Sequence, residues 1–91
     1  MKNSLEHLSE FISAKLREVE AADKAFALGA ISFDEFEFIV IASKASVHGF
    51  SCACYSFGDK VAGVHDEEKG FTEKVDKIYM NCFSRYLRFN F

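Results

Sequence analysis

Proline and tryptophan are absent from this chain of 91 residues, and leucine occurs only five times. Without proline, no residue forces a helix to kink or to stop. Eleven phenylalanines compensate for the scarce leucines, since each ring can bury a large apolar area. A chain this short buries only about 60–65% of the surface that its unfolded form exposes. We therefore expect a single domain over residues 1–91, with one modest core.

An excess of positive charge is also missing. Eleven lysines and arginines stand against fourteen aspartates and glutamates, for a net charge of −3. This balance argues against a strongly basic nucleic-acid binder and is too mild for an acidic nucleic-acid mimic. Hydrophobic residues make up 49% and charged residues 27%, which is typical of a globular protein and not of a disordered one.

The compartment is predicted from further absences. Three cysteines, an odd number, do not suit a secreted disulfide scaffold, and the N-terminus has no apolar signal segment. Residues 38–58 carry one formal charge, Lys44, and are long enough to span a bilayer. Their four serines, two glycines and His48 argue against a membrane span. We expect a cytoplasmic protein with free thiols and no membrane contact.

Residues 4–28 predict a first amphipathic helix, because apolar side chains recur every three or four positions. These positions are Leu5, Leu8, Ile12, Leu16, Val19, Ala22 and Phe26. Gly29 follows where a helix C-terminal glycine belongs.

A second helix is predicted over residues 33–60. Ser32 and Glu35 have the spacing of a capping box, in which each side chain accepts a hydrogen bond from the other residue's amide. Apolar side chains then follow at helical spacing, with one serine among them: Phe33, Phe36, Val40, Ser43, Val47, Phe50, Cys54, Phe57 and Val61. The alternative is an α+β fold with a strand or hairpin within 36–57, which is rich in strand-forming residues.

Residues 62–70 are polar and predict a loop, and residues 71–89 predict a third helix. Its apolar stripe comprises Phe71, Val75, Ile78, Cys82 and Phe89, flanked by Tyr79, Phe83 and Tyr86. The expected fold is mostly α, a compact three-helix bundle.

Residues 29–36 resemble the second half of an EF-hand calcium loop, with Gly29 and Glu35 at matching positions. The earlier ligand positions would be Lys24, Phe26 and Leu28, whose side chains supply none of the oxygen atoms that calcium needs. The short resemblance therefore predicts no calcium site.

Metal and cofactor sites are not expected elsewhere. His48, Cys52 and Cys54 are weak candidates for metal ligands, because their spacing is not that of a structural zinc site. Cys54 and Cys82 lie on the predicted core stripes, where cysteine acts as a small hydrophobic residue. No phosphate-binding glycine loop, nucleophile elbow or zinc-protease motif occurs, so no enzyme is predicted. A Cys–His pair would escape this search, since such residues meet only in space.

Two segments are candidates for partner binding. Residues 36–42 are apolar nearly all round a helix, so Phe38 and Ile41, off the buried stripe, are expected to meet another chain. The C-terminal segment mixes arginine with aromatic residues, as protein interfaces do. Its candidate anchors are Tyr86, Arg88, Phe89 and Phe91.

These observations predict a small non-enzymatic protein–protein interaction module. It would act as an adaptor or inhibitor by occupying a partner's surface, and it would self-associate as a homo-oligomer. The alternative is a small nucleic-acid-associated regulator that uses the C-terminal arginines and aromatics, because such residues can stack on bases.

Overall fold

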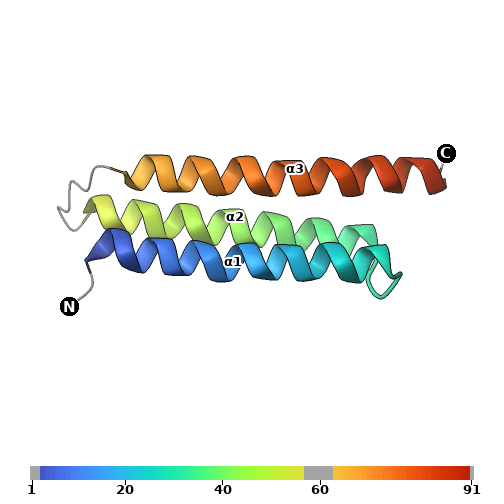
Figure 1. The fold of residues 1–91 in the computed structure, drawn as a ribbon, viewed down its shortest axis with the longest axis horizontal. Helices are drawn as coiled ribbons and strands as arrows, with labels where there is room; N and C mark the ends of the chain where they lie inside the picture. The colour runs from blue at the N-terminus through green and yellow to red at the C-terminus, as the bar shows by residue number, and fades with distance from the viewer. Residues whose placement is uncertain (1–2, 57–62, 91) are drawn as a thin grey trace.

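The computed structural model describes residues 3–56 and 63–90, which form three helices packed side by side. In chain order these are α1 (Ser4–Ala27), α2 (Phe33–Ser56) and α3 (Val64–Asn90), each antiparallel to the next (Figure 1). Each helix contacts both others, which confirms the three-helix bundle. The described residues contain no strand, and residues 36–56 are entirely helical, so the α+β alternative is wrong.

The hairpin between α1 and α2 follows from local sequence signals. Gly29 adopts a φ of 76°, and its amide bonds to the carbonyl oxygen of Phe26 at 3.0 Å. The Ala30 amide reaches back to Ala25 at 2.8 Å, which completes a Schellman termination of α1. The predicted capping box then opens α2: the Glu35 amide donates to Ser32 Oγ at 3.1 Å, and the Ser32 amide donates to Glu35 Oε1 at 3.4 Å.

The second and third helices differ from the prediction at their bounds. α2 ends at Ser56 in the described structure, and the predicted helical residues 57–60 lie outside the described ranges. α3 begins at Val64 and not at Phe71, so the predicted loop over 62–70 is wrong from Val64 onward.

The physical reason for the early start of α3 lies in its first turns. Gly63, at a φ of 111°, turns the chain into the helix, and Val64 is fully buried. The carboxylates of Asp66 and Glu67 lie in the first turn, where they interact favourably with the helix dipole. Polar residues that resemble a loop in the sequence therefore form the solvent side of a helix.

The core runs between the helices and is richest in aromatic rings where the α1–α2 hairpin meets the end of α3. The Phe33 ring stacks on Tyr86 with centroids 4.6 Å apart and lies 5.9 Å from both Tyr79 and Phe83. The buried apolar residues come from all three helices: Leu8, Ile12, Val19, Ala22, Phe33, Phe36, Val40, Val47, Cys54, Val64, Phe71, Val75 and Cys82. Most of the predicted apolar stripes therefore face the core.

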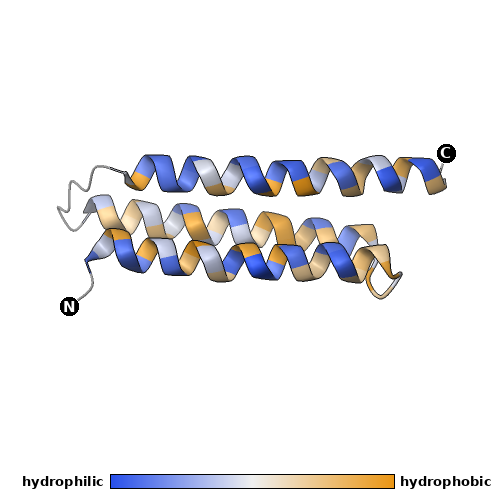
Figure 2. Cartoon of the chain, viewed as in Figure 1, coloured by the Kyte–Doolittle hydropathy of each residue, from blue (hydrophilic) through white to orange (hydrophobic). Residues whose placement is uncertain are grey.

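The helices differ in what they expose. Figure 2 shows hydrophilic segments all along α1 and α3, whereas α2 is mostly pale or apolar. By length and composition alone, α2 could cross a membrane, although the core helix of a soluble protein can pass the same test. Only 28% of its most apolar window is buried inside the bundle, so much of this composition faces outward.

Candidate functional site

Beyond the exposed Asp34 of its first turn, α2 has an uncharged surface over residues 38–52 on the side that faces away from the bundle. At about 100° of rotation per residue, one set of positions lies opposite the buried ones. We call this set the outer face of α2: Phe38, Ile41, Ala42, Ala45, Gly49 and Cys52, all exposed. Phe38 is 71% exposed and Ile41 is 60% exposed, so both predicted partner-binding residues on this helix are open to solvent.

The outer face has no charge because the charged groups of α2 beyond its first turn are directed toward α3. Lys44 forms an ion pair with Asp76, with 2.9 Å between Nζ and Oδ1. The Glu37 carboxylate accepts a hydrogen bond from the Tyr79 hydroxyl at 2.6 Å. This hydrogen bond, with burial and the nearby negative charge, raises the pKa of Tyr79. Residues 38–56 contain no other Asp, Glu, Lys or Arg, so the outer face presents only apolar and small side chains.

The C-terminal candidates do not form one surface. Tyr86 is half-buried and stacks on Phe33, so it serves the protein's own core. Phe89, predicted both on the apolar stripe of α3 and as an anchor, is 82% exposed, and Arg88 is exposed beside it. Phe91 lies outside the described residues. Tyr79, Phe83 and Tyr86 pack against the core, so Phe89 is the one strongly exposed ring in the described tail. The described tail therefore offers a single ring on which a nucleic-acid base could stack.

The three weak metal-ligand candidates are divided between two environments. Cys54 is buried, and its thiol lies 4.0 Å from the carbonyl oxygen of Ser4. His48 and Cys52 are exposed on neighbouring turns of α2. Among the residues that the structure describes, no three His, Cys, Asp or Glu side chains are grouped to hold a metal ion.

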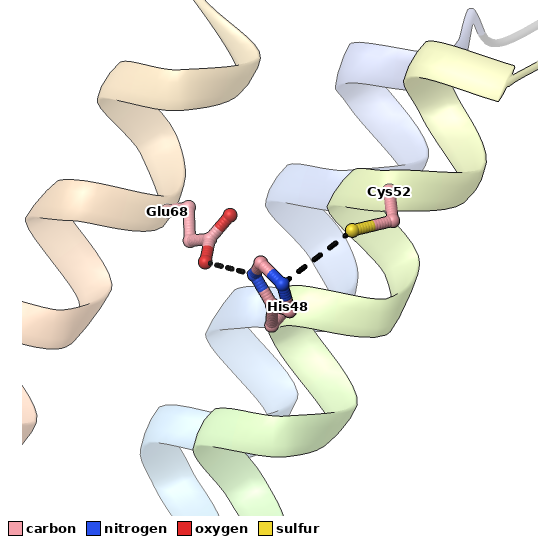
Figure 3. Close-up of polar contacts among 3 residues, drawn as sticks. All are labelled: His48, Cys52 and Glu68. Atoms are coloured by element: carbon pink, nitrogen blue, oxygen red, sulfur yellow. Dashed lines mark hydrogen bonds and ion pairs between the residues drawn. The ribbon is translucent and has the colours of Figure 1, made fainter.

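His48 instead lies between a thiol and a carboxylate (Figure 3). Its Nε2 is 3.5 Å from Cys52 Sγ, and its Nδ1 is 2.9 Å from Glu68 Oε2 on α3. The sequence shows the four-residue spacing of His48 and Cys52, but it does not predict the contact between His48 and Glu68. Glu68 falls in the segment predicted as a loop, and no sequence signal fixes the register of α3 against α2.

The third cysteine is chemically protected. Cys82 is fully buried, and its thiol donates to Asp23 Oδ1 at 3.0 Å. Burial, followed by the hydrogen bond to Asp23 and its negative charge, raises the pKa of Cys82 to about 12. The burial of Cys54 and Cys82 confirms their prediction as core residues.

No protein-family model, curated protein or solved structure matches this chain. Two features therefore stand as candidates on their own geometry: the outer face of α2 and the Cys52–His48–Glu68 group.

Proposed function

We propose that this chain is a small, non-enzymatic protein–protein interaction module of the cytoplasm. It works as an adaptor or inhibitor by occupying a partner's surface, and the part of the outer face of α2 over Phe38, Ile41, Ala42 and Ala45 is the surface that binds. The observation that carries this proposal is the exposure of Phe38 and Ile41 on a helix face without charge.

Contact of this apolar face with water carries a free-energy cost that a bound partner would remove. Full burial of one large apolar side chain stabilises a complex by about 1.5–3 kcal/mol relative to its exposed state. Phe38 and Ile41 lie about one turn apart on the same face, so a single partner helix can cover both.

The partner that best fits this face is a second copy of the chain. A twofold axis brings equivalent residues together, so a charged patch would repel its own copy, and this face has no charge over residues 38–52. Ala42 and Ala45 lie beside the two large residues and permit close approach. In an antiparallel pair centred between Ile41 and Ala42, each Phe38 would pack on Ala45 of the other copy.

The test is to place a charge on this face. Phe38→Asp and Ile41→Asp should each give a folded monomer, whereas the wild type should be a dimer at micromolar concentration. Phe36→Asp should unfold the chain, because Phe36 is fully buried. Sedimentation velocity measures the mass, and circular dichroism checks the fold.

Met80→Asp provides the matched control, because Met80 is an apolar residue 54% exposed on α3. It should leave the dimer intact. A wild type that stays monomeric at high micromolar concentration would overturn the self-association. Flotation of the wild type with phosphatidylcholine vesicles would instead assign the apolar face to a membrane; we expect the protein to remain unbound.

A further inference from the structure

The Cys52–His48–Glu68 group lies outside the Phe38–Ile41 part of the outer face and carries a separate inference. We propose that Cys52 is a nucleophilic thiol, with His48 as its base and Glu68 as the positioning residue, and that it forms mixed disulfides with small disulfide compounds. The group joins two successive turns of α2 to the first turns of α3 (Figure 3).

The hydrogen-bond partners fix which imidazole nitrogen carries the proton. An ionised carboxylate can only accept, so His48 Nδ1, 2.9 Å from Glu68 Oε2, is the N–H donor. The lone pair of Nε2 then faces Cys52 Sγ at 3.5 Å and can take the thiol proton. The Glu68 carboxylate stabilises the imidazolium that results. A nucleophile, its base and a group that orients the base are the parts of an activated thiol.

Exposure separates Cys52 from the other cysteines. Cys54 and Cys82 are 4% and 0% exposed, whereas Cys52 is exposed on the helix surface. The Glu68 side chain is 25% exposed and the His48 side chain is 68% exposed, so their contact lies at the surface, within reach of a reagent in solution. A groove next to the His48 ring is lined by Glu68, Lys69 and Thr72 among others, and the Cys52 thiol lies outside this groove on the open surface of α2.

The exchange reaction balances without any further reactant. His48 Nε2 takes the proton from Cys52, and the thiolate sulfur attacks one sulfur of the small disulfide. A new S–S bond forms as the old one breaks, and the departing thiolate takes the proton from the imidazolium. The electron pair of the Cys52 thiolate forms the new S–S bond, and the electron pair of the old S–S bond leaves with the released sulfur. The products are Cys52 oxidised in a mixed disulfide and one free small thiol, which is the reduced half of the reagent.

The experiment measures how fast Cys52 reacts with bis(2-hydroxyethyl) disulfide, an uncharged probe, at neutral pH. Intact mass spectrometry follows the addition of one mercaptoethanol group, and peptide mapping locates it. His48→Asn should slow the reaction about ten-fold, which is less than the roughly 10²–10⁴-fold that a positioned base typically contributes, because this site is exposed. Glu68→Gln should slow it less. Both side chains lie at the surface, so both variants should fold, as circular dichroism will verify.

Two comparisons separate activation from simple exposure. The thiol introduced by Ser46→Cys in a Cys52→Ser background lies exposed on the same helix, with Ala42 in place of a histidine four residues earlier. It should react at the rate of Cys52 in His48→Asn. Glu68→Gln should have no effect once His48 is replaced, since it acts through that ring.

Equal rates for Cys52 and the Ser46→Cys thiol would overturn the proposal, and so would an undiminished rate in His48→Asn. Measurement in the Phe38→Asp background keeps this test independent of self-association. A failure of the dimer therefore leaves the thiol result interpretable.

Discussion

The three cysteines have the same side chain and three different environments. Cys52 is exposed next to an imidazole, Cys54 is packed between helices, and Cys82 is buried against the Asp23 carboxylate. A thiol reacts as its thiolate, so burial and a negative neighbour protect Cys82. Because the pKa of Cys82 is raised in the folded state, the free energy of unfolding also depends on pH in the alkaline range.

We expect the free energy of unfolding to fall as pH rises from about 9 toward 12. Below pH 9 both states keep the Cys82 proton. Above it the unfolded chain loses that proton first, because burial raises the pKa of Cys82 to about 12 in the folded state. Tyr79 acts in the same direction at somewhat higher pH, since its hydrogen bond to Glu37 raises its pKa. The unfolded state then binds fewer protons, and folding becomes less favourable. Urea unfolding at a series of pH values measures this slope.

The control for the loss of stability at alkaline pH is a variant without the Cys82 thiol and the Tyr79 hydroxyl. Cys82→Ala with Tyr79→Phe should be less stable at neutral pH but should lose less stability between pH 9 and 11 than the wild type. Equal slopes would show that other groups cause the alkaline loss.

Ser51 is a second residue whose surroundings allow a prediction. It is 1% exposed, and its hydroxyl has no hydrogen-bond partner in the structure. An unsatisfied buried polar group costs about 1–3 kcal/mol, and alanine also forms helix better than serine. Ser51→Ala should therefore stabilise the protein by about 1 kcal/mol in urea unfolding. Ser46→Ala, at an exposed site on α2, should give only the smaller helix-propensity gain. A destabilised Ser51→Ala would contradict this explanation.

At the scale of the helices, the first two turns of α3 are polar in sequence and yet helical in the structure. Gly70 lies inside the helix, and apart from its chain neighbours and the backbone of its own helix, a β-carbon there would meet no atom within 4 Å. Glycine in a helix interior costs up to about 1 kcal/mol relative to alanine.

Gly70→Ala should thus stabilise the chain by about 0.5–1 kcal/mol, measured by urea unfolding. Gly29→Ala is the contrasting control. It should destabilise, because Gly29 has a φ of 76°, which an L side chain rarely adopts. If Gly70→Ala has no stabilising effect, the helix does not extend through residues 64–70 in solution.

The helices also show what a sequence can and cannot predict. The capping box at Ser32 and the glycine at the end of α1 are local signals, and both are present as predicted. The partners across the bundle are not local. Phe33 pairs with Tyr86, and His48 pairs with Glu68, through the register of α3, which the spacing within each helix leaves open. For that reason Tyr86 was predicted as a partner-binding residue although it packs on the core.

The whole molecule is long and thin, with principal extents of 49 × 20 × 15 Å. In a bundle of three helices, each helix has two neighbours and one outward side. The residues on that outward side therefore decide whether it stays in water or binds another chain. Hydrophilic residues recur along α1 and α3 (Figure 2), and many of their exposed residues are charged, whereas the exposed residues of α2 beyond its first turn are mostly small or apolar. This asymmetry makes α2 the side on which we expect another chain.

The end of α3 offers the competing surface, and two substitutions compare it with α2. Phe89→Ala should change the free energy of unfolding by less than about 0.5 kcal/mol, because the ring is 82% exposed. Tyr86→Ala should cost about 2 kcal/mol, because it removes the ring stacked on Phe33. The dimer should survive Phe89→Ala and dissociate with Phe38→Asp, as measured by sedimentation velocity on the folded variants. The opposite result, a dimer lost with Phe89→Ala and kept with Phe38→Asp, would move the interface from the middle of the bundle to its C-terminal end. The partner would then meet α3 beside Arg88, and the uncharged face of α2 would need a different explanation.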